Sequence, residues 1–292
     1  MALKYSIIID TLATFGLSIW DNPGEVFERV AHAGYDAVDI TAEPDRIDLE
    51  RYREVTDIAR AAGLEVAALL GAWATWHAGE ARDLGSPDDA VRRYAIDYAK
   101  KCTTLAVELN VGVYEICCAP AVPQYPAHET PLNIVRENFV KSACEISQHA
   151  ARPGVSVAME PINRFEGYAG FMNSVVDAVS VAEEVGEDNL GVMVDFFHAN
   201  MEDVSVPSAI RRAGPRLMLI HLADSNRQMP GTGHVDFTQV IRELDEIDFD
   251  GYLSLDCVPA RPDAKTYLEG SIGYMKQLEQ AVAVEQQLAG IS

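Results

Sequence analysis

The sequence predicts an α/β fold, a single closed (β/α)₈ barrel of the TIM type. Eight short apolar runs rich in β-branched residues alternate with longer amphipathic stretches, as in repeated βα units. Most of these runs are apolar on both faces, which is typical of parallel strands covered by helices on one side and packed side chains on the other. Because the chain also shows no linker or low-complexity segment, we expect one barrel domain over residues 1–292.

The expected elements follow one another along the whole chain. The predicted strands are Tyr5–Ile9, Asp36–Ile40, Glu65–Leu70, Val113–Cys117, Ser156–Glu160, Gly191–Asp195, Leu217–His221 and Tyr252–Asp256. The predicted helices are Glu25–Ala33, Leu49–Ala62, Asp88–Leu109, Leu132–Ala151, Ser174–Val185, Ser208–Ala213, Phe237–Leu244 and Ala264–Leu288. A doubly wound open sheet is the competing fold, but no glycine-rich phosphate loop follows the first strand.

Several helix boundaries carry their own signals. Gly34 and Gly63 each come just after a helix, where a left-handed glycine ends the helix and leads into the next strand. Before the third helix, Ser86 reads as the capping residue and Pro87 as the first helical position. Asn22-Pro23 is a weaker start of the same kind for the first helix.

Composition excludes several classes of protein. The formal net charge is −22 without a lysine or arginine cluster, so we expect no nucleic-acid partner. No apolar stretch is long enough to span a membrane, and the first apolar run is too short for a signal peptide. Five cysteines without zinc-ligand spacing indicate reduced thiols, and we therefore expect a cytoplasmic protein.

The last four strands share an unusual ending. Each apolar run closes on a side chain that can bind a metal ion: Glu160, Asp195, His221 and Asp256. A single carboxylate at a strand end is more often a loop cap or an ion-pair partner. Four in succession are hard to attribute to caps, because the carboxyl ends of barrel strands converge on one rim. Three carboxylates and one imidazole favour a single divalent ion, with Mn²⁺ first and Mg²⁺ or Co²⁺ as alternatives.

The loops after these strands supply candidates for binding a polyhydroxylated substrate. Glu166, His198 and Arg227 each follow one of the four strand ends within a few residues. For His198 the alternative is a core histidine, and for Arg227 a surface ion pair. After the third strand, Trp76 is a candidate wall against a sugar face, although core packing explains a tryptophan there equally well.

At these residues the chain resembles the sugar isomerase/epimerase superfamily of xylose isomerase-like barrels, nearest its D-tagatose/D-psicose 3-epimerase branch. The segments that carry the resemblance are Glu160-Pro161-Ile162-Asn163-Arg164-Phe165-Glu166, Asp195-Phe196-Phe197-His198 and His221-Leu222-Ala223-Asp224-Ser225-Asn226-Arg227. The resemblance implies a metal-dependent epimerase or isomerase of a ketose or keto-sugar derivative. Its metal ligands would be Glu160, Asp195, His221 and Asp256, while Glu166, His198 and Arg227 would hold the sugar.

In the mechanism that the resemblance implies, Glu160 and Asp256 act on opposite faces of an enediolate stabilised by the metal ion. One carboxylate removes the proton beside the carbonyl, and the other returns a proton to the other face. The sequence departs from the family at Asp256, where glutamate is usual. Aspartate shortens the reach of the carboxylate by roughly 1.5 Å, one carbon–carbon bond. The segment 118–126 after the fourth strand matches no epimerase loop.

Two other functions remain open on the sequence alone. A lyase or dehydratase, as in inosose dehydratase or the catalytic subunits of C-glycoside-cleaving enzymes, would use the same enolate to expel a neighbouring group. A non-catalytic subunit would bind metal and sugar without proton exchange. For the epimerase we expect a homo-oligomer, whereas the lyase would need a partner subunit. In every case the predicted ligand is a small sugar.

Overall fold

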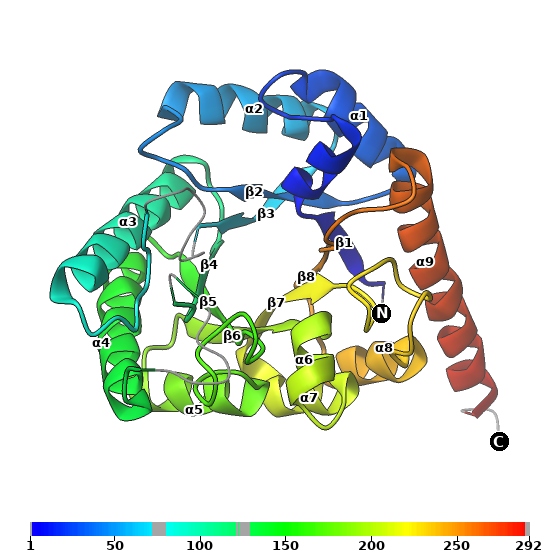
Figure 1. Cartoon of the computed structure of the whole chain (residues 1–292). Helices are drawn as coiled ribbons and strands as arrows, with labels where there is room; N and C mark the ends of the chain where they lie inside the picture. The colour runs from blue at the N-terminus through cyan, green and yellow to red at the C-terminus, as the bar shows by residue number, and fades with distance from the viewer. Residues whose placement is uncertain (1, 72–79, 121, 123–128, 290–292) are drawn as a thin grey trace.

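The computed structural model describes residues 2–71, 80–120, 122 and 129–289, and its eight strands form one parallel sheet (Figure 1). From β2 to β8 each strand pairs with the next along the chain, and β8 pairs with β1. A parallel bridge between Ile8 and Asp39 links the first two strands and closes the ring. The predicted barrel is therefore confirmed. Its strands are β1 (Lys4–Ile7), β2 (Ala37–Thr41), β3 (Glu65–Leu70), β4 (Val113–Cys117), β5 (Ser156–Glu160), β6 (Leu190–Asp195), β7 (Leu217–Leu222) and β8 (Tyr252–Leu255).

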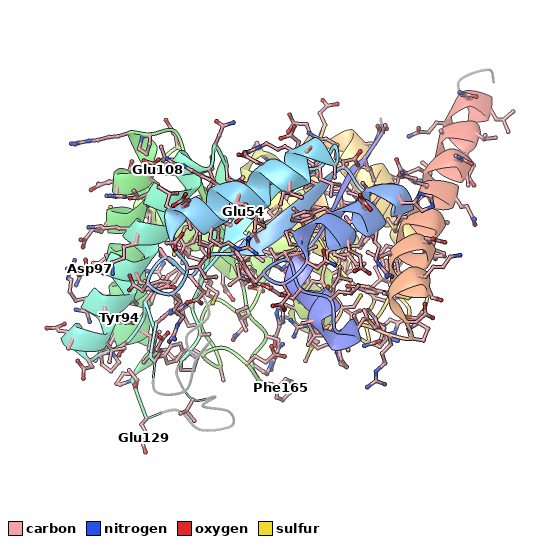
Figure 2. All side chains as sticks on the ribbon, turned by 90° about the horizontal axis from the view of Figure 1, so that it is seen from above. Glu54, Tyr94, Asp97, Glu108, Glu129 and Phe165 are labelled. Atoms are coloured by element: carbon pink, nitrogen blue, oxygen red, sulfur yellow. The ribbon has the colours of Figure 1, made fainter. Side chains whose placement is uncertain are left out.

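Helices surround the ring on its outer side (Figure 1). The helices of this outer layer are α1 (Pro23–Ala33), α2 (Leu49–Ala61), α3 (Asp89–Glu108), α4 (Leu132–Ala151), α5 (Val175–Val185), α7 (Val206–Ala213), α8 (Phe237–Glu246) and α9 (Ala264–Ala289). Shorter helices lie in the connections: α6 (Phe196–Glu202) and the 3-10 helices η1 (Ile9–Phe15) and η2 (Gly214–Arg216). Figure 2 shows Glu54, Asp97 and Glu108 pointing outward from α2 and α3, and all three are exposed. No helix in the described part of the chain is long and apolar enough to cross a membrane.

Most predicted boundaries lie within two residues of the observed ones, and the differences have local causes. The start of α3 is one correction, because Asp88 rather than Ser86 caps the helix: its carboxylate accepts from the backbone N–H groups of Ala90 and Val91. Ser86 instead accepts the N–H of Asp88 in the preceding turn. At the end of α1, Gly34 adopts the predicted left-handed conformation with φ 96°.

Three short helices were not predicted, and two of them, η1 and α6, lie at the rim where strands end. η1 follows β1 directly, and α6 begins immediately after β6 with Asp195 as its N-cap. The sequence Phe196-Phe197-His198 reads as a turn because it is too short to show a helical period. Both helices place side chains over the carboxyl-end face of the barrel.

Side chains that point into the barrel form a cluster of their own, separate from the larger core between sheet and helices. The apolar members of this inner cluster are Ala68, Leu70, Ala158, Met193 and Leu219. Successive residues of a strand point to opposite faces. Asp195 and His221, two residues beyond Met193 and Leu219, therefore point to the same inner side and toward the carboxyl-end rim. This alternation selects the residues that can meet at the site.

Candidate functional site

The four predicted strand-end residues lie at one level of the barrel rim. Glu160 and Asp195 are the last residues of β5 and β6, and Asp256 directly follows β8. Asp195 and His221 are register partners across β6 and β7. All four are buried, with exposed fractions between 1% and 5%. Burial of three acids and an imidazole is costly unless they act on a common partner.

His221 is the centre of this cluster. Its Nδ1 lies 3.4 Å from Oε1 of Glu160 and 3.8 Å from Oδ2 of Asp195. Asp195, His221 and Asp256 each offer one possible metal-ligand atom, and these three atoms lie within 4.8 Å of one another. Glu160 belongs to two further groups of the same size, one with His221 and Glu115 and one with Asp195 and His198. The four residues that the sequence singled out as metal ligands thus belong to overlapping groups of three, which share His221, Glu160 and Asp195.

Several oxygens of the cluster have lone pairs that are free to bind a cation. Neither oxygen of Glu160 has a hydrogen-bond partner among the described residues, and the same holds for Oδ2 of Asp195. Buried acceptors without donors are costly, by about 1–3 kcal/mol each. A hard divalent ion would satisfy several of them at once. The residues therefore fit a divalent metal centre.

The charges of the cluster lower the pKa of Glu160 and raise the pKa of His221. Burial alone would raise the pKa of Glu160, but the neighbouring His221 and His198 lower it to about 2. Burial alone would lower the pKa of His221, but Glu160, Glu115 and Asp256 raise it to about 10. Glu160 is therefore a carboxylate at neutral pH, and His221 holds a positive charge among the acids. A proton on His221 competes directly with a metal ion.

His198 is oriented as a hydrogen-bond donor toward the cluster. Its Nδ1 accepts the backbone N–H of Asn163 at 3.4 Å and lies 2.7 Å from the side-chain nitrogen of that residue. Because a backbone N–H can only donate, the neutral ring carries its proton on Nε2. That Nε2 lies 3.8 Å from Glu160 and has no hydrogen-bond partner in the described chain. His198 therefore presents a free N–H rather than a metal-binding lone pair.

Arg227 connects two carboxylates on the wall of the site. Its Nη2 lies 3.2 Å from Oδ2 of Asp256, and its Nη1 lies 3.3 Å from Oε2 of Glu166. The guanidinium also lies over the ring of Phe197, 5.1 Å from its centroid. Arg227 is thus held in the site rather than on the surface, unlike the exposed ion pairs of the outer helices.

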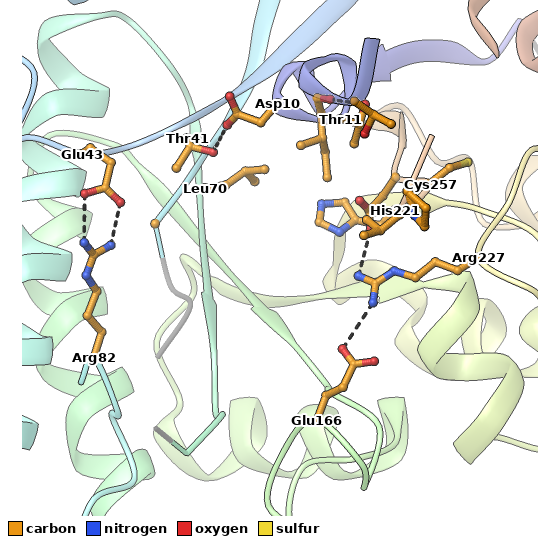
Figure 3. A pocket seen from close by; sticks show the side chains of 16 residues that line it. Asp10, Thr11, Thr41, Glu43, Leu70, Arg82, Glu166, His221, Arg227 and Cys257 are labelled. Atoms are coloured by element: carbon orange, nitrogen blue, oxygen red, sulfur yellow. Dashed lines mark hydrogen bonds and ion pairs between the residues drawn. The ribbon is translucent and has the colours of Figure 1, made fainter. Parts of the chain in front are cut away.

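A cavity of about 480 Å³ opens beside the cluster. His221, Arg227 and Glu166 line one wall of it (Figure 3). Asp256, the partner of Arg227, also lines the cavity. The opposite wall comes from the first three strands and the loops that follow them, with Asp10, Thr41, Leu70, Glu43 and Arg82. Its volume falls in the usual range of small-molecule sites, and polar groups face it from both sides.

The opposite wall was not predicted from the sequence. Arg82 and Glu43 form a buried two-bonded ion pair with both N–O distances at 2.9 Å, and the hydroxyl of Thr41 donates to Asp10 (Figure 3). These residues lie in loops or at ends of early strands, where no run of four similar endings marks them. Trp76, the predicted wall residue after β3, lies outside the described residues.

Glu115 was not predicted as a site residue either, although its place in the sequence is unusual. It is a lone acid inside the apolar strand β4, and the structure buries it completely next to Glu160 and His221. An unpaired glutamate between apolar neighbours is uncommon enough in a buried strand to mark a candidate site.

The chain is similar in sequence and in structure to proteins named as 3-epimerases. Over 231 residues the chain is 29% identical to L-ribulose 3-epimerase of Methylomonas sp. (strain DH-1), covering 77% of this chain and 75% of that protein. It is 28% identical to D-psicose 3-epimerase of Enterocloster bolteae, covering 77% and 73%. A solved structure of an L-ribulose 3-epimerase superposes with a TM-score of 0.84 at 19% identity, covering 99% of this chain and 98% of that one.

The predicted resemblance is therefore confirmed. Residues 27–278 match the family described as xylose isomerase-like TIM barrel. This match spans all the strand ends from β2 to β8 and all four residues of the buried cluster. The chain belongs to the xylose isomerase-like TIM barrel family.

Proposed function

We propose that this protein is a divalent-metal-dependent sugar epimerase that exchanges the proton on C3 of a ketose. The observation that carries the proposal is the buried cluster around His221. Glu160 and Asp195 supply its unpaired oxygens, and His221 and Asp256 line a cavity of sugar-binding size beside it. The names of the relatives, an L-ribulose and a D-psicose 3-epimerase, support a ketose substrate and reaction at C3. They also favour epimerisation over the elimination that a lyase would carry out.

The proposed metal ligands are Glu160, Asp195, His221 and Asp256, and we propose Mn²⁺ as the physiological ion. A divalent ion, when bound, would stabilise the negative charge that develops on the carbonyl oxygen, which lowers the barrier by several kcal/mol. A proton beside a ketone is too weakly acidic for an unaided carboxylate, so this stabilisation is necessary.

Glu160 and Asp256 are the proposed proton-transfer residues. Glu160 is grouped with His221 and with Asp195, and Asp256 is grouped with both, so each carboxylate lies beside the proposed ion site. Glu160 is the proposed acceptor of the C3 proton, and its neighbouring histidines keep it ionised by lowering its pKa. We place Asp256 on the opposite face of the planar intermediate, where it would deliver a proton that it has taken up from solvent. Two carboxylates so placed allow inversion without rotation of the sugar.

The sugar itself would be held by residues beside the cluster. His198 presents its Nε2–H as a donor to a sugar oxygen, since no described residue accepts that proton. Arg227 and Glu166, already joined at 3.3 Å, present donors and an acceptor from the cavity wall. We retain Trp76 as a proposed contact and a homo-oligomer as the proposed assembly.

Incubation with ketoses in deuterated water tests the proposal. The protein loaded with Mn²⁺ should convert D-psicose or L-ribulose to its C3 epimer and place deuterium at C3, as read by chromatography and NMR. Glu160→Gln should abolish both signals. A product that has lost a hydroxyl or aglycone would establish the lyase instead, and sugar binding without deuterium at any carbon would establish the non-catalytic subunit.

A further inference from the structure

Glu115 is a fully buried acid that the proposed proton transfer does not use. Its exposed fraction is 0%, and neither of its carboxyl oxygens has a hydrogen-bond partner in the described chain. The described lysine and arginine side chains form no ion pair with it. Such a group destabilises a barrel core because its oxygens lose their hydrogen bonds to water and gain none from the protein. A buried polar group of this kind calls for a functional explanation.

The register of the sheet places Glu115 one layer below the metal cluster. Glu115 pairs with Ala158 of β5, whereas Glu160, two residues further along β5, pairs with Cys117. Because residues two apart on a strand share a face, Glu115 and Ala158 point to the same inner side as Glu160. The methyl side chain of Ala158 occupies little of this layer. The longer side chain of Glu115 thus has room to reach toward His221.

The imidazole of His221 lies between acids on its two sides. Its Nδ1 faces the cluster, 3.4 Å from Glu160 and 3.8 Å from Asp195. Its Nε2 faces the opposite way, 3.6 Å from Oε2 of Glu115, and has no hydrogen-bond partner among the described residues. One nitrogen therefore points to the ion-binding oxygens and the other points to Glu115.

We propose that Glu115 is the positioning residue of the metal centre, which holds the proton of His221 on Nε2 and so leaves Nδ1 as the metal ligand. Only one nitrogen of a neutral imidazole has a lone pair, and the group beside the other nitrogen decides which one it is. A carboxyl oxygen accepts a hydrogen bond from Nε2–H whether Glu115 is charged or neutral. Carboxylates that orient metal-bound histidines in this way raise metal affinity by about 10- to 100-fold.

This inference rests on the proposed metal centre, but it also requires a result that the metal centre alone does not. The ring of His221 must lose its fixed orientation when residue 115 cannot accept a hydrogen bond. Glu115→Met keeps the length of the side chain and removes the acceptor, whereas Glu115→Gln keeps a carbonyl oxygen. Tyr114→Phe is the matched control, because it removes a buried hydroxyl from the adjacent residue, which points to the other face of β4.

Mn²⁺ binding to the full-length metal-free protein, measured by calorimetry, is the first readout. Glu115→Met should bind Mn²⁺ about 10- to 100-fold more weakly than the wild type. Glu115→Gln should lose less, and Tyr114→Phe should bind as the wild type does. Circular dichroism verifies the fold of each variant, and if Glu115→Met does not fold, the comparison of Glu115→Gln with the wild type decides.

NMR of protein labelled with ¹⁵N-histidine and loaded with Zn²⁺ is the second readout, and a merely structural role would not change it. In the wild type, His221 should show a proton on Nε2 that exchanges slowly with water, and the signal is assigned by its loss in His221→Asn. In Glu115→Met this proton should exchange faster or move to a new resonance.

Three results would overturn the inference. Equal Mn²⁺ affinity and an unchanged His221 signal in Glu115→Met would remove the positioning role while the metal centre stands. A wild-type spectrum with Nε2 as the metal-bound nitrogen, or a stoichiometry of two ions per chain, would make Glu115 a ligand instead. If the wild type binds no divalent ion, the proposed function fails together with this inference.

Discussion

Arg227 holds Asp256 against the cavity wall, with 3.2 Å between Nη2 of the arginine and Oδ2 of the aspartate. Its backbone has the left-handed φ of 57°, which few side-chain-bearing residues adopt, and its N–H donates to the carbonyl of Asp224 at 2.8 Å. The carbonyl of Arg227 in turn accepts the N–H of Val258, beyond β8. The arginine is thus fixed by its backbone as well as by its two acidic partners. This rigidity sets the position of a proposed proton-transfer group.

Arg227→Lys should therefore impair catalysis more than metal binding. A lysine ammonium is a point charge and cannot bridge Asp256 and Glu166 as the planar guanidinium does. A displacement of about 1 Å at a reacting group can cost around 100-fold in rate, so we expect kcat/KM to fall by about that factor. Steady-state kinetics measures this change, and calorimetry should show Mn²⁺ affinity altered far less.

Arg164→Lys is the matched control for that variant. Arg164 also pairs with an acid, Glu202, at 2.5 Å, but neither residue lines the cavity of the site. The kcat/KM of the Arg164→Lys variant should stay near that of the wild type. An equal loss of rate in both variants would contradict the specific role of Arg227.

Glu160→Gln should abolish activity and weaken metal binding while the fold is retained. The amide has the same shape as the carboxylate, but it is uncharged and a poor base, and Glu160 has both oxygens free for the ion. Glu166→Gln is the contrasting change, because Glu166 lines the cavity beside Arg227 and belongs to none of the donor groups around His221. It should raise KM and leave Mn²⁺ affinity largely intact. Full turnover by metal-free Glu160→Gln protein would refute the proposed chemistry.

Metal binding should release a proton near neutral pH. The pKa of His221 is raised from 6.5 to about 10 by its acidic neighbours, so the ring is charged at pH 7 and must lose a proton before Nδ1 can bind an ion. Affinity for Mn²⁺ should therefore rise with pH, by up to tenfold per pH unit, and level off near pH 10. Calorimetry in buffers of different ionisation enthalpy counts the released protons, and a count of zero at pH 7 would contradict this assignment.

The same shift gives the sign of one contribution to the stability of the metal-free protein. The folded-state pKa of His221 lies above its unfolded value of about 6.5. Its contribution is therefore complete below pH 6.5 and is lost as the pH rises toward 10. Denaturant unfolding of His221→Gln should show a weaker fall in stability over this range than the wild type does.

Asp256→Glu tests whether the site is adjusted to the shorter acid. The extra methylene moves the carboxylate by roughly 1.5 Å and displaces it from Arg227. We expect kcat/KM on the native substrate to fall by about 10- to 100-fold, with Mn²⁺ still bound. Faster epimerisation of a free ketohexose by this variant would show that the native aspartate diverts the site from that reaction.

The sequence by itself determined the barrel and the four residues of the cluster. The period of each strand and helix is local, so β3, β4, β5 and α4 were predicted with their observed bounds. Glu160, Asp195, His221 and Asp256 could be found because each ends or directly follows an apolar run. The carboxyl ends of parallel barrel strands meet at one rim, and this general rule converts four separate positions into one site.

The tertiary structure decided which other side chains join that site. Strands that are apolar on both faces do not reveal which face points inward, so Glu115 could not be placed beside His221 before the ring closed. Arg82 meets Glu43 across a loop, and Asn163 selects the free nitrogen of His198, through contacts between residues distant in sequence. Such contacts depend on strand register and barrel closure, and no local pattern of residues encodes either one.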